Sequence, residues 1–129
     1  MAGYWGEVLT VAAEVALVVG LVIDGGVRDI AAMTSRRFAV FTRGISMRGT
    51  IKASSPSVGR PISFAGTPVV QGDLVVADDD GVLVIPAQHV KLTLANGQQR
   101  ADKEAGFMRQ LKDGKTTLEL LGLQSWSGS

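Results

Sequence analysis

One ten-residue segment, 20–29 (GLVIDGGVRD), constrains this chain of 129 residues more than any other. Its first part, 21–23, is apolar and rich in β-branched side chains, which predicts a buried strand. The next three residues, 24–26, include two glycines that tolerate positive φ, so they predict a turn at which the strand ends. A cation and an anion, Arg28 and Asp29, follow that turn. Because a strand end fixes their position and the glycines let a ligand approach closely, this Arg–Asp pair is our candidate site.

The composition indicates one globular domain without a polyanionic partner. Apolar residues make up 46% of the chain and charged residues 19%, a balance that supports a core. The formal net charge is +1, and the 13 lysines and arginines are scattered, with only Arg36 and Arg37 adjacent. Because no basic tract with interleaved aromatic residues is present, we expect no nucleic-acid partner.

The chain contains no cysteine and one histidine, His89. This excludes disulfides, zinc–thiolate sites, thiol nucleophiles and clusters of several imidazoles. Any bound metal would be a hard ion with oxygen ligands, such as Mg²⁺ or Mn²⁺. The lack of cysteine also fits a reducing compartment, and we expect a cytoplasmic protein.

The apolar run 8–23 is not expected to cross a membrane. Glu14 interrupts it, and Glu7 and Asp24 bound it, whereas a span needs about 20 apolar residues with few charges. We predict a buried helix over 7–18, covered on most sides, followed by the strand at 21–23.

Strands in the middle of the chain and helices at both ends predict an α+β fold with a mixed sheet. The clearest element is a hairpin, in which strands 74–77 and 82–85 are joined by Asp-Asp-Asp-Gly at 78–81. Asn96 and Gly97 accept the left-handed conformation of a helix end, so they predict a stop between two helices. The other predicted elements are a helical turn at 29–33, strands 38–41 and 62–65, a turn at 66–68, a Ser/Pro/Gly-rich loop at 54–61, helices 87–95, 101–111 and 116–121, and a tail at 123–129.

The residue types around the Arg–Asp pair allow a site for a keto acid. Arg28 can hold a carboxylate or an enolate oxygen with two parallel N–H groups, and Asp29 can hold a hard cation. The start of the first helix offers free backbone N–H groups that can bind a carboxylate, and a glutamate in the same turn can approach a metal directly or through water. These groups belong to Gly6, Glu7, Val8 and Leu9.

Each of these features also has a plain structural interpretation. The Arg–Asp pair can be a surface ion pair, and Glu104 can be a solvated charge on a C-terminal helix. The aspartates 78–80 resemble a metal cluster, but a solvated hairpin tip is the better interpretation. We expect His89 on a helix surface and Trp5 in packing.

Five segments of the chain carry a family resemblance: 5–9 (WGEVL), 22–29 (VIDGGVRD), 41–44 (FTRG), 48–50 (RGT) and 72–86 (GDLVVADDDGVLVIP). Together they resemble the regulator of ribonuclease activity A family, and more narrowly its 4-hydroxy-4-methyl-2-oxoglutarate aldolase branch. The resemblance extends to about residue 121.

The resemblance implies a layered β/β/α swivelling fold, similar to a phosphohistidine domain, with a mixed sheet and C-terminal helices in one domain over residues 1–122. It implies a class II pyruvate aldolase that requires a divalent metal, Mg²⁺ or Mn²⁺. Such enzymes cleave 4-hydroxy-4-methyl-2-oxoglutarate or 4-carboxy-4-hydroxy-2-oxoadipate to pyruvate and a second keto acid, and they also decarboxylate oxaloacetate. Members assemble as homotrimers or hexamers with sites between subunits.

The family's site maps onto residues already singled out. Arg28 matches its catalytic and substrate-binding arginine, Asp29 matches its metal-binding aspartate, and residues 6–9 match its backbone clamp for the substrate. An acidic residue from a neighbouring subunit's C-terminal helix falls near Glu104. The metal and the guanidinium would stabilise an enolate without any lysine Schiff base. The predicted base is a metal-bound water held by Glu7 or Glu104.

Two alternatives stay open at the level of sequence. The family's namesake branch binds and inhibits a ribonuclease without catalysis, although the presence of Asp29, which that branch need not keep, favours an enzyme. The family also has a further lobe before the Trp-Gly-Glu segment, so we expect this chain to be truncated at its N-terminus relative to the family. A truncated, inactive relative is therefore the second alternative.

Overall fold

A computed structural model describes residues 1–51 and 57–123 and divides the chain into two compact units, Met1–Pro86 and Ala87–Ser129. The prediction of one domain over residues 1–122 stays a prediction. Part of the predicted loop at 54–61 and nearly all of the predicted tail at 123–129 lie outside the described residues.

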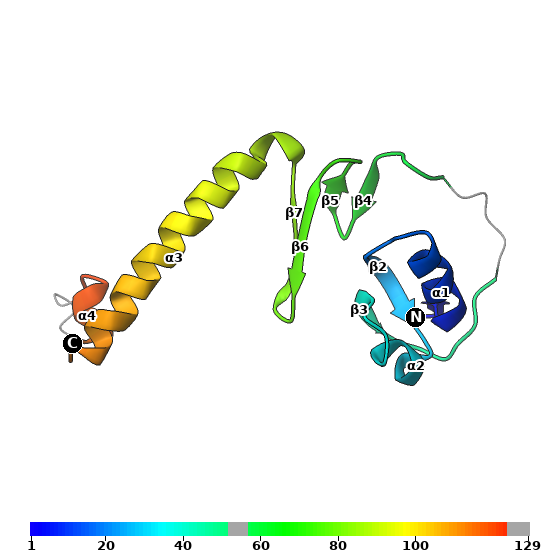
Figure 1. Cartoon of the computed structure of the whole chain (residues 1–129), viewed down its shortest axis with the longest axis horizontal. Helices are drawn as coiled ribbons and strands as arrows, with labels where there is room; N and C mark the ends of the chain where they lie inside the picture. Colours follow the sequence, from blue (N-terminus) through cyan, green and yellow to red (C-terminus); the bar gives the residue numbers. More distant parts are fainter. Residues whose placement is uncertain (52–56, 124–129) are drawn as a thin grey trace, which may run out of the picture. The chain divides into compact units, whose positions relative to one another are not determined.

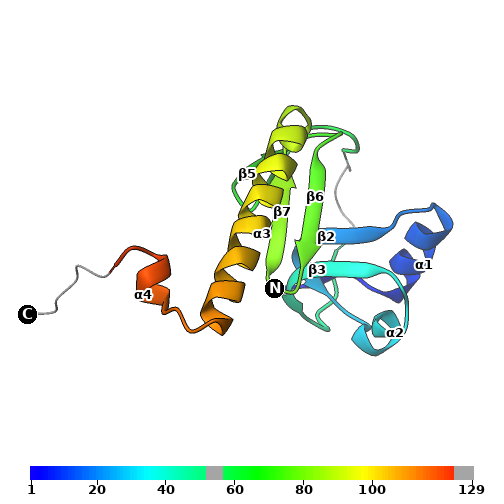
Figure 2. The same cartoon turned by 60° about the vertical axis from the view of Figure 1, so that its left-hand side comes forward.

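The first unit begins with a parallel three-stranded sheet of order β1-β2-β3, formed by β1 (Gly3–Trp5), β2 (Gly20–Val27) and β3 (Ala39–Ile45). Helix α1 (Glu7–Val15) connects β1 to β2, and α2 (Ile30–Thr34) connects β2 to β3. Figures 1 and 2 both show β2 and β3 side by side, with α1 and α2 beside them. The parallel pairing follows from these helical connections, because a parallel strand pair needs a crossover segment.

The predicted turn at residues 24–26 is wrong, because β2 continues through it to Val27 with a shift in register between Ile23 and Gly26. Neither Gly25 nor Gly26 has a positive φ. A Cβ atom on Gly26 would lie 2.6 Å from the carbonyl oxygen of Ala2, and one on Gly25 would lie 3.0 Å from the Tyr4 ring. These glycines therefore let the N-terminal segment approach β2 closely, rather than reversing the chain.

Two antiparallel hairpins follow in the first unit: β4 (Ile62–Phe64) with β5 (Thr67–Val69), and β6 (Leu74–Asp78) with β7 (Gly81–Ile85). The second confirms the predicted hairpin, and the Asp78 carboxylate accepts the N–H groups of Asp80 at 2.9 Å and Gly81 at 3.3 Å. Most of the turn predicted at 66–68 belongs to β5. Parallel and antiparallel pairs both occur, but in separate sheets, so one mixed sheet is not found in the described residues. The α+β class is confirmed.

A small buried cluster ties β1 to α1. The Trp5 ring stacks on Phe38 with centroids 6.4 Å apart, and its indole N–H donates to the Thr10 hydroxyl at 2.8 Å. Thr10 is fully buried and donates in turn to the Gly6 carbonyl at 3.1 Å. Trp5 thus acts in packing, as expected. The prediction that the first helix is covered on most sides is wrong, since Val8 and Val15 are about four-fifths exposed.

In the second unit a short 3-10 turn (Ala87–His89) leads into α3 (Val90–Lys112), followed by α4 (Thr117–Leu120). His89 is exposed, as expected. The predicted helix stop at Asn96 and Gly97 is wrong, because α3 runs through both residues (Figure 2). A glycine costs a helix interior only about 1 kcal/mol relative to alanine, so the good helix formers on both sides outweigh it. No helix among residues 1–51 and 57–123 combines the length and apolar character that a membrane crossing requires.

Replacing Gly97 with alanine is expected to stabilise α3 by about 0.5–1 kcal/mol, because alanine loses less backbone entropy in a helix interior. A Cβ atom there would meet no atom within 4 Å. Thermal and urea unfolding followed by circular dichroism measures the change. The matched control is Gly114→Ala, which is expected to destabilise, since Gly114 has a φ of +96°. Equal effects of the two substitutions would contradict the continuous helix.

Candidate functional site

Arg28 and Asp29 lie between the end of β2 and the start of α2. The Arg28 N–H donates to the Trp5 carbonyl at 2.8 Å, which fixes this end of β2 against β1. Asp29 adopts the left-handed conformation, with φ +59° and ψ 37°, which is uncommon for a residue with a side chain. The Arg28 Nε and Asp29 Oδ2 atoms are 3.6 Å apart, and each side chain is 46% exposed. The pair is therefore formed but open to solvent.

The Asp29 carboxylate lies at the amino end of α1. Its Oδ2 atom accepts the Glu7 backbone N–H at 3.1 Å. Gly6 is the N-cap residue of α1 and has no side chain to cap the helix, so Asp29 supplies that acceptor from 22 residues along the chain. A carboxylate is favourable here, because the first N–H groups of a helix are unpaired and its amino end is positive.

Gly6 allows the Asp29 carboxylate to approach the amino end of α1. A Cβ atom built on Gly6 would collide with Asp29 Oδ2 and would lie 3.0 Å from Arg28 Cγ and 3.1 Å from Arg28 Nε. The glycine at this position thus provides the space that the acidic and basic side chains occupy. The sequence predicts only a backbone role for Gly6, because the Asp29 carboxylate that fills this space lies 23 residues further along the chain.

An open cavity of about 620 Å³ adjoins these groups. Its lining combines the two charged side chains of the pair with mostly apolar neighbours. The lining residues are Glu7, Arg28, Asp29, Ile30, Ala31, Ala32, Ile45 and Met47. A small ligand in this cavity would meet a guanidinium, a carboxylate and the amino end of α1 together.

The structure also places the other residues of the predicted clamp. The first intrahelical bond of α1 joins the Thr10 N–H to the Gly6 carbonyl at 3.1 Å, so the N–H groups of Val8 and Leu9 precede the helical hydrogen-bond pattern. The side chains of Val8 and Leu9 are exposed. These two N–H groups, beside the one that Asp29 accepts, are the ones a ligand carboxylate could use.

The Glu7 carboxylate is paired with a residue that sequence reasoning missed. Glu7 Oε1 accepts Arg36 Nη2 at 3.0 Å, and Glu14 Oε2 accepts Arg36 Nη1 at 2.9 Å. The hydrogen bond to Glu7 raises the pKa of Arg36 above its ordinary value, and the nearby charge of Glu14 adds to this. The only hint in the sequence was the Arg36–Arg37 doublet, which says nothing about partners.

Glu104 lies in the second unit, on α3, with its side chain 54% exposed. Its carboxylate accepts Arg100 Nε at 2.7 Å, one helical turn away, and this bond raises the pKa of Arg100. In this unit Glu104 is therefore a solvated, paired charge.

Asp29 offers a single carboxylate for a metal. Among residues 1–51 and 57–123, no group of three His, Asp or Glu side chains is arranged to hold an ion. The acidic hairpin tip at 78–80 is an exposed turn, in which the Asp78 carboxylate accepts backbone N–H groups. Mg²⁺ is commonly held by one or two carboxylates, with waters and substrate oxygens completing its shell, so the Asp29 carboxylate suits it.

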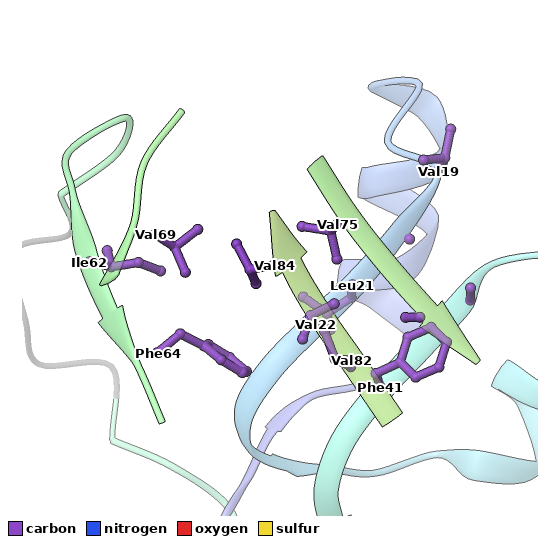
Figure 3. A pocket seen from close by; sticks show the side chains of 13 residues that line it. Val19, Leu21, Val22, Phe41, Ile62, Phe64, Val69, Val75, Val82 and Val84 are labelled. Atoms are coloured by element: carbon purple, nitrogen blue, oxygen red, sulfur yellow. The ribbon is translucent and has the colours of Figure 1, made fainter. Parts of the chain in front are cut away.

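A second cavity, of about 470 Å³, also lies in the first unit (Figure 3). Its lining is apolar throughout and contributes no titratable side chain. The lining residues are Val19, Gly20, Leu21, Val22, Ala39, Phe41, Ile62, Phe64, Val69, Val75, Ala77, Val82 and Val84. Because it contains neither acid nor base, this cavity does not compete with the Arg–Asp pair as a candidate site.

A family model described as RraA-like (Aldolase/RraA) matches residues 1–84. The chain belongs to the RraA-like family. A relative from Halalkalibacterium halodurans with the provisional name 4-hydroxy-4-methyl-2-oxoglutarate aldolase is 38% identical over 89 residues, which cover 68% of this chain and 42% of the relative. Protein DlpA of Legionella pneumophila is 39% identical over 83 residues, 64% of this chain and 14% of DlpA.

A solved structure of an uncharacterised protein from Pseudomonas syringae pv. tomato str. DC3000 resembles this RraA-like chain with a TM-score of 0.78 and 27% sequence identity. The match covers 92% of this chain and 60% of that protein. This RraA-like chain thus spans less than two thirds of the length of each of these relatives. Membership of the family therefore does not by itself assign the activity of a whole relative to this chain.

Replacing Gly6 with alanine is expected to displace the Asp29 and Arg28 side chains without removing either of them. The colliding atom, Asp29 Oδ2, is the end of a side chain that can rotate, so we expect the free energy of unfolding to change by less than about 1 kcal/mol. In ¹H–¹⁵N spectra the Glu7 amide proton should shift upfield as its bond to the carboxylate is lost. Gly49→Ala is the matched control, since a Cβ atom there meets nothing within 4 Å. An unchanged Glu7 resonance in Gly6→Ala would contradict the described geometry.

Proposed function

We propose that this RraA-like protein is a divalent-metal-dependent pyruvate aldolase of the class II type. Its substrates would be 4-hydroxy-4-methyl-2-oxoglutarate or 4-carboxy-4-hydroxy-2-oxoadipate, with oxaloacetate decarboxylation as a second activity. The observation that carries the proposal is the meeting of Arg28, Asp29 and the amino end of α1 beside one cavity of about 620 Å³. The provisional name of the Halalkalibacterium relative supports the substrate class.

Asp29 would hold the metal, either Mg²⁺ or Mn²⁺. One of its oxygens accepts the Glu7 N–H, and its half-exposed carboxylate keeps further lone pairs free for a cation. When bound, the metal would act as a Lewis acid that polarises the substrate's keto oxygen.

Arg28 would bind the substrate and stabilise negative charge. Aldol cleavage removes the proton of the substrate's hydroxyl group, breaks the adjacent carbon–carbon bond and leaves the pyruvate half as an enolate. Loss of CO₂ from oxaloacetate leaves the same enolate, so one site serves both reactions. The Arg28 guanidinium presents N–H donors where that negative charge develops.

The amino end of α1 would position the substrate. The N–H groups of Val8 and Leu9 are suited to the pyruvate carboxylate, which places the keto group toward Arg28 and Asp29. Arg36 pairs with the Glu7 carboxylate and is only 28% exposed, so Glu7 is a weaker candidate to hold the metal-bound water that would act as the base. Glu104 from another copy of the chain is the stronger candidate, because its own partner, Arg100, is 81% exposed and that surface pair is easier to displace.

We propose a homotrimer or hexamer in the cytoplasm, in which the layered β/β/α swivelling arrangement is completed. One observation supports an assembly. No side chain of α3 is buried in the described structure, although the helix carries exposed leucines and methionine such as Leu92, Leu94 and Met108. Exposed apolar side chains on one element commonly mark a protein interface.

Asp29→Asn is expected to lower pyruvate release from oxaloacetate in the presence of Mg²⁺ by roughly 100-fold or more, since the amide removes the charge that would hold the cation. A chelator should abolish the wild-type activity. Asp79→Asn is the matched control at the hairpin tip and should retain activity. A coupled lactate dehydrogenase assay measures the pyruvate.

Two results would overturn the proposal: equal activity of Asp29→Asn and wild type, or wild-type turnover that a chelator leaves intact. A wild-type protein that releases no pyruvate and binds no metal would support a non-catalytic binding protein or an inactive relative.

A further inference from the structure

Arg36 is a charged residue close to the candidate site whose contacts the proposed chemistry does not use. It follows α2 and bridges two carboxylates of α1, with Nη2 to Glu7 Oε1 at 3.0 Å and Nη1 to Glu14 Oε2 at 2.9 Å. Its side chain is 28% exposed, and its Nε atom is buried without a hydrogen-bond partner among the described residues. The Arg36 guanidinium therefore pairs mainly with carboxylates of α1 and has little contact with solvent.

The two glutamates lie at opposite ends of the helix, and their carboxylates converge on one guanidinium. Glu7 is the first residue of α1 and Glu14 is its penultimate one, so their positions differ by two turns, or about 10.5 Å of helical rise. The planar fork of an arginine has a fixed geometry, so pairing with both ends limits the rotation and the axial sliding of α1. A single surface ion pair would not impose both limits.

This restraint reaches the candidate site through the backbone. The Glu7 N–H is the group that donates to Asp29 Oδ2 at 3.1 Å, and it belongs to the residue whose carboxylate Arg36 holds. The position of the first turn of α1 therefore determines where the Asp29 carboxylate lies. It also determines where the N–H groups of Val8 and Leu9 point.

We propose that Arg36 is a positioning residue for the Arg28–Asp29 site, and that Glu7 acts through Arg36 rather than as a metal ligand or a base. The consequence for turnover rests on the proposed function. The structural consequence, a first turn of α1 held against Asp29, does not depend on any activity.

The structural consequence is tested on the metal-free full chain by ¹H–¹⁵N spectroscopy. Asp29→Asn first establishes how the Glu7 amide resonance moves when its charged acceptor is lost. Arg36→Gln should move the same resonance in the same direction, and Arg36→Lys, which keeps the charge but cannot reach both carboxylates with a fork, should move it by less. Arg37→Gln is the matched control, an adjacent exposed arginine, and should leave the resonance in place. An unchanged Glu7 amide resonance in both Arg36 variants would overturn the proposal.

The catalytic consequence is tested by a double-mutant cycle on pyruvate release and on Mn²⁺ affinity. Arg36→Gln and Glu7→Gln should each lower kcat by roughly 10-fold or more, because small displacements of positioning groups are costly. If Glu7 acts only through Arg36, the double variant should be no worse than either single variant. Two results would show a direct role for Glu7 and overturn the proposal. One is a kcat in the double variant that is lowered by the product of the two single effects, and the other is a further drop in Mn²⁺ affinity when Glu7→Gln is added to Arg36→Gln.

The two tests separate this inference from the proposed function. A wild-type protein without turnover or Mn²⁺ binding defeats the aldolase proposal, while the Glu7 amide resonance still decides whether Arg36 positions α1. A wild-type aldolase with normal activity in Arg36→Gln defeats the positioning role and leaves the aldolase proposal standing.

Discussion

The candidate site depends on one hydrogen bond, from the Glu7 backbone N–H to the Asp29 carboxylate across the space left by Gly6. A carboxylate at the amino end of a helix is favoured by unpaired N–H groups and by the helix dipole. In this chain the bond also joins two crossover connections of the parallel sheet, since α1 precedes β2 and Asp29 follows it. The same interaction therefore caps a helix, holds Asp29 in a left-handed conformation and leaves the Arg28 guanidinium beside a cavity.

Sequence patterns predicted correctly those elements that depend on interactions between residues close together in the chain. The β6–β7 hairpin was predicted from apolar runs around an Asp-Asp-Asp-Gly turn. Arg28 and Asp29 do follow a strand, as predicted, although β2 ends at Val27 and not before the glycines. The role of Gly25 and Gly26 was predicted wrongly, because what matters is β1 lying against them, a contact that no local pattern encodes. The predicted end of a helix at Asn96 and Gly97 was also wrong, because the helix formers on both sides outweigh that local stop signal and α3 continues.

The geometry of the site was predicted only in part, because some of its contacts join residues that are far apart in the sequence. The meeting of the Arg–Asp pair with the first helix was expected from a family resemblance and from the free N–H groups of a helix start. The pairing of Arg36 with Glu14 and Glu7 spans 22 and 29 residues, so it could not be found without the fold. It changes the interpretation of Glu7 from a candidate metal contact to a residue whose carboxylate is already occupied. Residues 6–9 thus act at the site mainly through their backbone.

The measurement that tests the central claim most directly is paramagnetic broadening of amide resonances by substoichiometric Mn²⁺. If Asp29 holds the cation at the amino end of α1, the amides of residues 7–9 and 28–30 should broaden first, because they lie around that carboxylate. The acidic hairpin tip at 78–80 should broaden only at higher concentrations. Broadening centred on 78–80, or no preference among the amides, would contradict the assignment of Asp29 as the metal-binding group.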